Sequence, residues 1–223
     1  MPEKKLFELF LEAMKQNKEL SQKQKRVLKS SLELFATQGF DRTSTADIAQ
    51  KAEVSQGTVY KQFKTKQSLL INGLAPIIKE TLDDAIKDFE REKFQTNPLT
   101  LDAFLHTIVF DRSRFLENNI LAAKVIFDQI LVNQEFSLLI KDFFFKKILA
   151  LLGPKLDLLK KKNELIDLPN EKIFSFIFTN IVGPIILNDH PRSNEELEDT
   201  YQILLRSLKK KSDQTGHLLI VLQ

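Results

Sequence analysis

The chain has 223 residues, of which 43% are hydrophobic and 28% are charged, an ordinary composition for a soluble protein. Gly (6) and Pro (7) are too scarce for the many turns of an all-β protein of this size, which favours helices. The lack of cysteine excludes disulfides, zinc–thiolate sites and cysteine nucleophiles, and there are three histidines. We therefore expect no metal site and no cofactor.

The charge is unevenly distributed along the chain. The first 66 residues carry 13 Lys+Arg against 8 Asp+Glu, a surplus of +5, whereas the rest of the chain has a net charge of −2. A basic first third on a near-neutral body is typical of proteins that contact nucleic acid or an acidic membrane.

Residues 1–22 form the first predicted element, an extra amphipathic helix. Leu6, Phe10 and Met14 recur every four residues, so they share one helical face that needs burial, and we expect this face to pack on the body. Contact with DNA through Lys4 and Lys5, or fraying, are the alternatives. Acidic residues interrupt the apolar stretch and no small-residue cleavage site follows, so a signal peptide is not expected.

The segment 23–68 carries the most informative pattern. A helix is predicted over about residues 25–38, ending at Gly39, which suits the left-handed position after a helix, and Phe40 can fold back on that end. Ser44 precedes an acidic residue by three positions, which resembles a capping box that starts a short helix over about residues 45–52.

A third helix is predicted over about residues 56–63, capped by Ser55 and anchored by Val59 and Phe63. Two short helices joined by a three-residue turn, with small alanines at the crossing, predict a helix-turn-helix. The outer face of the second helix bears small, amide and basic side chains, which suit entry into a DNA major groove. The alternative is a helical hairpin with a solvated polar face.

This segment resembles the DNA-binding domain of the TetR family of bacterial transcriptional repressors. The resemblance covers about 45 residues and is carried by Ala36, Gly39–Phe40, Thr43, Thr45, Ile48–Ala49, Ala52, Val54–Ser55, Gly57–Thr58, Tyr60, Phe63, Lys66 and Leu69–Leu70. The family commonly has Gly where this chain has Glu53, and a non-Gly residue in a left-handed turn costs about 1 kcal/mol. The geometry of the turn is therefore left open.

The resemblance also implies roles for individual side chains. Thr45 and Tyr60, together with Thr43, are expected to contact phosphates, and Lys66 is expected to cap the far end of the third helix against the DNA backbone. The groove-facing set is Gln56, Gly57, Thr58, Lys61 and Gln62. Of these, Lys61 and Gln62 are the candidates for base readout.

Residues 69–210 are predicted to form a helical ligand-binding and dimerisation domain, followed by a tail over residues 211–223. A long helix over about residues 66–94 contains Gly73 and Pro76, and its bend is either a lever that transmits a ligand signal or a plain helix break. Further helix ends are expected near Gly153–Pro154 and at other Gly, Pro and Asn positions.

Aromatic residues are concentrated in this second part, with 13 of the 18 Phe beyond residue 88. They either fill a helical core or line a pocket for a small hydrophobic ligand, and single polar groups within apolar helices favour the pocket. The candidate ligand-binding residues are His106, Phe110, Phe127, Gln129, Phe144, Phe178 and Asn180. For each polar member, a satisfied core or interface residue is the alternative.

The resemblance implies a homodimer in which the last two helices, about residues 170–188 and 193–210, form a four-helix bundle with their partner copies. The candidate interface residues are Phe174, Phe178, Ile181, Ile185, Leu204 and Leu208. Their apolar side chains need a cover, which is either a second copy or the rest of the same chain.

The sequence therefore predicts an all-α cytoplasmic protein with a helix-turn-helix DNA-binding domain. Its longest apolar run, residues 173–187, is shorter than the roughly 20 residues that span a bilayer, so no membrane partner is expected. No phosphate loop or nucleophile–base pair points to an enzyme. We expect a dimeric regulator, a repressor, that binds a palindromic operator in double-stranded DNA through residues 45–66 and is released by a hydrophobic small molecule. The alternative is a helical ligand-binding or scaffold protein without sequence-specific DNA binding.

Overall fold

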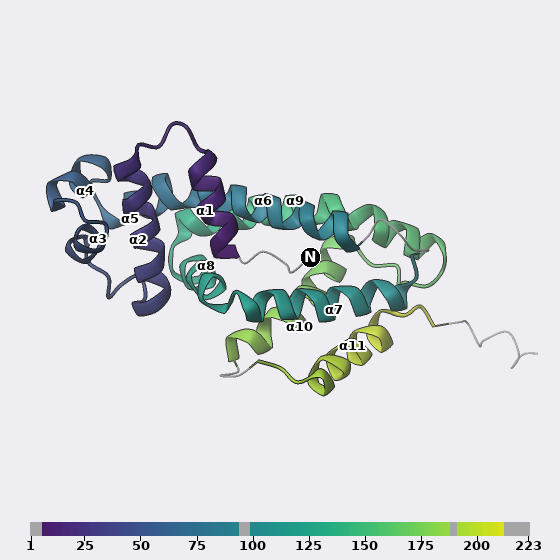
Figure 1. Ribbon diagram of the computed structural model, residues 1–223. Coiled ribbons are helices and arrows are strands. Elements are labelled where there is room, and N and C mark those ends of the chain that lie inside the picture. Colours follow the sequence, from purple (N-terminus) through teal and green to yellow (C-terminus); the bar gives the residue numbers. More distant parts are fainter. Residues whose placement is uncertain (1–5, 94–98, 188–190, 212–223) are drawn as a thin grey trace, which may run out of the picture. The chain divides into compact units, whose positions relative to one another are not determined.

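The computed structural model describes residues 6–93, 99–187 and 191–211, and within these ranges the protein is helical (Figure 1). The elements are α1 (Leu6–Gln16), α2 (Gln22–Gln38), α3 (Thr45–Lys51), α4 (Gln56–Gln62), α5 (Lys66–Ser68), the π-helix η1 (Leu69–Leu74), α6 (Ala75–Lys93), α7 (Leu101–Asn118), α8 (Ile120–Val132), α9 (Gln134–Lys161), α10 (Asn170–Leu187) and α11 (Asn194–Leu208). One isolated antiparallel bridge joins Leu165 and Lys209. The predicted all-α class is confirmed. The apolar C-terminal tail and the lysines at positions 4 and 5 lie outside the described residues.

Packing divides the chain into two units, each described by itself. The first contains residues 1–96 and 114–148, and the second contains residues 97–113 and 149–223. The first unit therefore joins the helix-turn-helix region to later helices, and its core is continuous from α1 to the start of α9. The boundaries predicted after residues 22, 68 and 210 stay predictions.

The core of the first unit is built on α2, whose Val27 and Leu28 are fully buried. Helix α1 packs mainly on α6 and also contacts α2, and its Phe10 and Met14 are buried, which confirms that its apolar face packs on the body. The main-chain N–H of Leu6 donates a 2.6 Å hydrogen bond to the Asn119 side chain, so the start of α1 is fixed at the α7–α8 corner.

The long helix predicted from residue 66 contains a π-helical segment. Helices α5, η1 and α6 follow one another without a break, and the N–H of Ala75 bonds to the carbonyl of Leu70, five residues earlier. Pro76 follows directly and cannot donate a hydrogen bond, so the helix changes its bonding pattern where proline interrupts it. A side chain on Gly73 would meet Leu28 and Phe63 at 2.6 and 2.9 Å, so this crossing requires glycine.

The second unit is held by contacts around the loop between α9 and α10. In that loop the Glu164 carboxylate accepts a 2.7 Å hydrogen bond from the N–H of Leu101, and its main-chain carbonyl accepts one from the N–H of Lys210. Tyr201 on α11 donates a 2.5 Å hydrogen bond to Asp102 on α7. These bonds tie the first turn of α7 and the end of α11 to one loop.

One predicted helix break is wrong. Helix α9 runs through Gly153 and Pro154 to Lys161. A proline removes one hydrogen bond from a helix, and here Leu152 and Leu156 on either side of it are buried, so packing holds the helix together.

Among the described residues, no helix is both long enough and apolar enough to cross a bilayer.

Candidate nucleic-acid interface

Capping residues define the two short helices of the predicted helix-turn-helix. The N–H of Ser44 bonds to the Asp47 carboxylate at 2.8 Å, and the N–H of Asp47 bonds to the Ser44 hydroxyl at 3.1 Å, which confirms the predicted capping box of α3. The hydrogen bond from the Ser44 backbone lowers the pKa of Asp47. The Ser55 hydroxyl caps α4 by accepting a 3.2 Å bond from the N–H of Thr58.

The turn between α3 and α4 adopts the left-handed geometry that glycine usually provides. Glu53 has a φ of 53°. The N–H of Val54 bonds to the carbonyl of Ala49, and the N–H of Glu53 bonds to the carbonyl of Gln50, the two bonds of a Schellman motif. The turn geometry is therefore kept although glycine is absent.

Gly39 ends α2 in a conformation more restrictive than the predicted left-handed one. Its φ of 87° and ψ of 156° lie in a region that is essentially open only to glycine. Phe40 then folds back, and its ring centre lies 4.9 Å from that of Phe35, as predicted.

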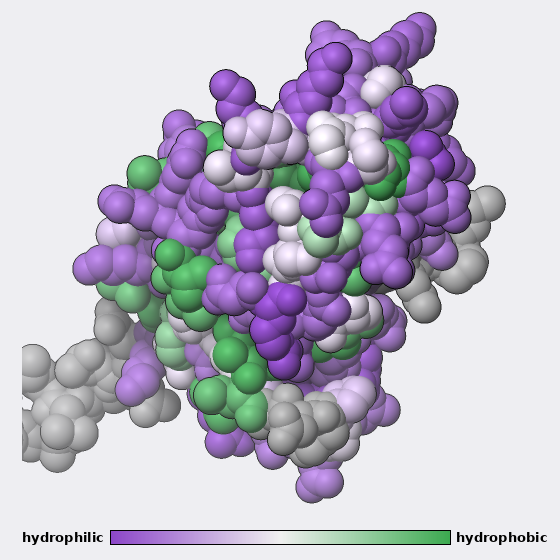
Figure 2. Space-filling model, turned by 90° about the vertical axis from the view of Figure 1, so that its left-hand side faces the viewer, coloured by the Kyte–Doolittle hydropathy of each residue, from purple (hydrophilic) through white to green (hydrophobic). Residues whose placement is uncertain are grey.

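Buried apolar residues orient the helix-turn-helix. On α3, Ile48 and Ala49 face the core, and on α4 Val59 is 1% exposed. The opposite side of α4 faces solvent, and the end of the first unit that carries α3 and α4 has a largely hydrophilic surface (Figure 2).

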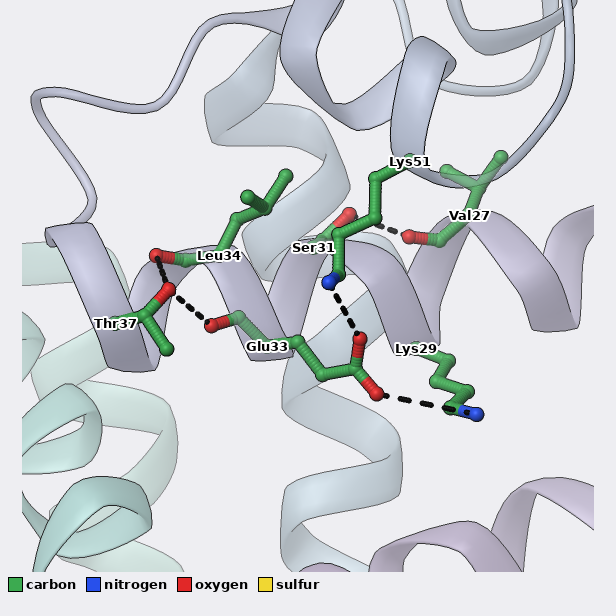
Figure 3. Close-up of polar contacts among 7 residues, drawn as sticks. All are labelled: Val27, Lys29, Ser31, Glu33, Leu34, Thr37 and Lys51. Carbon is green, nitrogen blue, oxygen red and sulfur yellow. Dashed lines mark hydrogen bonds and ion pairs between the residues drawn. The ribbon is translucent and has the colours of Figure 1, made fainter.

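An ion pair connects α2 and α3. Lys51 Nζ lies 3.1 Å from the Glu33 carboxylate, whose other oxygen lies 3.9 Å from Lys29 Nζ (Figure 3). On the same helix the Ser31 hydroxyl donates to the Val27 carbonyl, so this buried serine is satisfied within α2. Because the lysines stay half exposed, the pair leaves positive charge at this surface.

Most of the predicted DNA-contacting residues are accessible. The exposed members are Thr45, Gln56, Gly57, Tyr60 and Lys61, and Thr58 is half-buried. The Tyr60 ring is 67% exposed, unusual for a large aromatic residue. A Cβ added at Gly57 would have only the Ser55 hydroxyl within 4 Å, so the fold itself does not need glycine there.

Thr43 is a correction. It is 1% exposed, and its hydroxyl donates to the Gly39 carbonyl at 2.7 Å and accepts from the Gln38 amide at 3.2 Å. A buried hydroxyl with both bonds made is not available to phosphate, so Thr43 has a structural role at the end of α2.

Lys66 is a second correction. Its ammonium group donates to the main-chain carbonyls of Phe40, Asp41 and Thr43 at 2.6, 3.3 and 3.0 Å. An ammonium has three N–H groups, so this lysine spends its donors on the loop after α2. The expected contact with the DNA backbone is replaced by a contact with the protein backbone.

Gln62 differs from the other groove candidates. It is half-buried, and its Oε1 atom is inaccessible and has no hydrogen-bond partner in the protein. Lys61, which is exposed, is therefore the better placed of the two residues predicted to read bases.

The seven predicted ligand residues are divided between the two units. His106 is exposed, stacking on Phe110 at 4.4 Å and meeting the edge of Tyr201 at 5.5 Å, and Asn180 donates to a carbonyl of its own helix at 2.8 Å. Phe127, Phe144 and Phe178 are half-buried. Gln129 is 3% exposed and lines an open cavity of about 670 Å³. The expectation of a ligand pocket stays a prediction.

The predicted interface residues are mostly buried in the single chain. Of the six, Phe174, Ile181, Ile185, Leu204 and Leu208 are at most 6% exposed, and Phe178 is half-buried. The argument that they need a partner to cover them is therefore wrong, since the chain covers them itself. The apolar residues left exposed on α10 and α11 are others, namely Phe176, Ile186, Leu187 and Ile203.

Comparison with known proteins agrees with this geometry. The family model described as bacterial regulatory proteins, tetR family, matches residues 27–72, from α2 into η1. The chain is 38% identical over 53 residues to the uncharacterized HTH-type transcriptional regulator YerO of Bacillus subtilis, covering 24% of this chain and 18% of YerO. It is 31% identical over 113 residues to the HTH-type transcriptional regulator AcrR of Shigella flexneri, covering 47% of this chain and 50% of AcrR. The chain thus aligns with half or less of the length of these relatives.

A longer similarity is seen at the level of the fold. The crystal structure of the transcriptional regulator FadR from Bacillus subtilis, in complex with stearoyl-CoA, matches with a TM-score of 0.63 at 20% identity, covering 81% of this chain and 96% of that one. The predicted fold, a helix-turn-helix domain followed by a helical region, is thereby confirmed. The chain belongs to the TetR family of bacterial transcriptional regulators, with its helix-turn-helix in residues 27–72.

Proposed function

We propose that the protein regulates transcription by binding a palindromic operator in double-stranded DNA through residues 45–66. The observation that carries this proposal is the exposed face of α4, where Gln56, Gly57, Tyr60 and Lys61 face solvent while Val59 fixes the helix to the core. Small, amide and basic side chains on one face of an anchored helix suit the major groove.

The contacts divide into those that position the protein and those that read sequence. Thr45 at the start of α3 and the Tyr60 hydroxyl are accessible for phosphate oxygens. Lys61 is accessible for a base edge, and a lysine there would favour guanine, whose O6 and N7 accept hydrogen bonds. The Glu53 turn and the Ser55 cap hold α4 in place for both kinds of contact.

A homodimer through α10 and α11 is part of the proposal. Two helix-turn-helix copies bind half-sites about 34–36 Å apart, which needs a two-fold partner. Four apolar side chains on these helices are exposed in the single chain, and Leu187 and Ile203 are 82% and 55% exposed. A second copy packed on α10 and α11 would cover them.

Release from DNA by a hydrophobic small molecule completes the proposed repressor. FadR, which shares the fold, was crystallised with stearoyl-CoA, so this helical architecture accommodates an acyl ligand in at least one protein. A ligand releases DNA only if it binds the DNA-free conformation more tightly than the DNA-bound one.

The test is selection of duplexes from a random double-stranded library by the full-length protein. We expect an enriched motif with two inverted half-sites, and Lys61→Ala should bind this duplex with reduced preference over unrelated DNA. Lys172→Ala on α10 makes the same charge change at an exposed position outside the interface and should behave like the wild type. Enrichment of no motif, or equal loss in both variants, would contradict the proposal.

A further inference from the structure

An open cavity of about 670 Å³ lies in the first unit, between the loop that follows α2 and the corner between α8 and α9. The loop contributes Phe40 and Asp41, and the corner contributes Gln129, Val132, Glu135 and Leu138. A smaller cavity of about 260 Å³ shares four of these residues. The larger volume lies in the range of cavities that hold small organic molecules.

Gln129 is the first feature that points to a ligand. This side chain is 3% exposed, lines both cavities, and its Oε1 atom has no hydrogen-bond partner in the protein. A buried acceptor without a donor costs about 1–3 kcal/mol. A molecule in the cavity that carries an N–H or O–H group would remove this cost.

The charges of the lining residues specify the sign of the ligand. Asp41 and Glu135 line the larger cavity, and Asp128 lines the smaller one. Arg42 is the basic residue of the smaller cavity, and its Nε is already bonded to the Gln38 carbonyl at 2.6 Å. Acidic groups therefore outnumber basic ones, which favours a cation and disfavours a carboxylate or phosphate.

The corner between α8 and α9 also exposes aliphatic surface. Val132 and Leu138, which line the larger cavity, are 73% and 66% exposed, and Leu131 beside the smaller one is 76% exposed. Covering such side chains with an apolar group is favourable by about 25 cal/mol per Å² of apolar area. An alkyl or aryl group on the ligand would supply that cover.

We propose that this cavity binds an amphipathic organic cation that bears an N–H donor, such as a primary alkylammonium. Its apolar part lies against Val132 and Leu138, its charge faces Asp41 and Glu135, and an N–H points to Gln129. The loop that it contacts is the one that the Lys66 ammonium holds. The occupant therefore joins the end of α2 to the α8–α9 corner.

Calorimetric titration of the full chain with four eight-carbon probes tests the chemistry. We expect octylammonium to bind at least roughly tenfold more tightly than octanol and octanoate, and more tightly than octyltrimethylammonium, which has the charge but no N–H. Equal binding of octanoate and octylammonium overturns the charge argument and hence the proposal, and so does the absence of octylammonium binding.

Variants locate the site. Glu135→Gln, on an exposed residue of the first turn of α9, should weaken octylammonium binding several-fold, whereas Glu171→Gln, an exposed glutamate in the first turn of α10, should not. Gln129→Leu should abolish the preference for octylammonium over octyltrimethylammonium. Equal effects of the two glutamate variants overturn the proposed location. No DNA is present in this titration, so its outcome is independent of the proposed regulatory function.

Discussion

Lys66 donates a 2.6 Å hydrogen bond from its ammonium group to the main-chain carbonyl of Phe40, and the same group lies 4.3 Å from the centre of the Phe40 ring. The two residues are 26 positions apart, so this contact closes the helix-turn-helix region by linking the start of α5 to the end of α2. The lysine thereby stabilises the loop that leads into α3.

Replacement of this lysine should affect stability more than salt dependence. Lys66→Met keeps the aliphatic stem but removes the charged donors, and hydrogen bonds to charged groups are worth about 1.5–3 kcal/mol. We expect urea unfolding to show a loss of that size. The slope of log affinity against log salt for DNA should change by less than a phosphate contact would require, about 0.9. Unchanged stability together with a slope reduced by about 0.9 would restore the phosphate role.

Gly73 should tolerate no side chain, because a Cβ would lie 2.6 Å from Leu28 and 2.9 Å from Phe63, both buried. We expect Gly73→Ala to lower the free energy of unfolding by about 1–3 kcal/mol, the usual cost of overpacking a core. Gly183→Ala is the matched control, since that helical glycine has open space around it and alanine favours helices. Similar unfolding curves for Gly73→Ala and the wild type would show that the π-helix does not depend on this glycine.

Glu53 should be a site of easy stabilisation. Its φ of 53° is strained for a residue with a side chain, and its ion pair with Arg26, at 3.8 Å between largely exposed groups, contributes little. Glu53→Gly is expected to raise the free energy of unfolding by about 1 kcal/mol, measured by chemical denaturation. A lower stability in this variant would mean that the side chain matters more than the backbone strain.

Tyr201 should make the second unit sensitive to alkali. Burial, together with the hydrogen bond to Asp102, raises its pKa from 10.0 to about 12. The folded state keeps the phenol proton that the unfolded state loses, so this contribution to stability is complete below pH 10 and is lost as the pH rises towards 12. Tyr201→Phe should show a smaller fall in stability over this interval. In a Tyr60→Phe background, leaving one of the two tyrosines, phenolate absorbance should titrate near the raised value.

The parts that could be predicted from the sequence are those set by near neighbours in the chain. Ser44, Ser55 and Gly39 act on residues within four positions, so their spacing indicated the ends of α2, α3 and α4. The roles of Thr43 and Lys66 could not be predicted this way, because a hydroxyl or an ammonium can serve phosphate or backbone equally well. Only the fold shows which acceptors lie within reach.

The second part of the chain was harder to interpret because its helices are apolar on more than one side. Periodicity marked Ile181 and Leu204 as apolar faces, yet it does not distinguish burial within one chain from burial between two. The exposed residues Leu187 and Ile203 have the same chemical character, and only packing separates the two sets. Gln129 was recognised as a polar residue in an apolar helix, but its cavity depends on a loop from the other end of the sequence.

The central claim is that the exposed face of α4 enters the DNA groove, and Gly57→Ala tests it most directly. No protein atom crowds a Cβ at this position, and alanine stabilises a helix by about 1 kcal/mol relative to glycine, so the variant should be at least as stable as the wild type. The measurement is fluorescence anisotropy of the variant on the duplex selected by the wild type. We predict an affinity at least roughly tenfold lower, because the added methyl group occupies the closest approach of α4 to DNA. Unchanged affinity in this folded variant would contradict the placement of α4 in the groove.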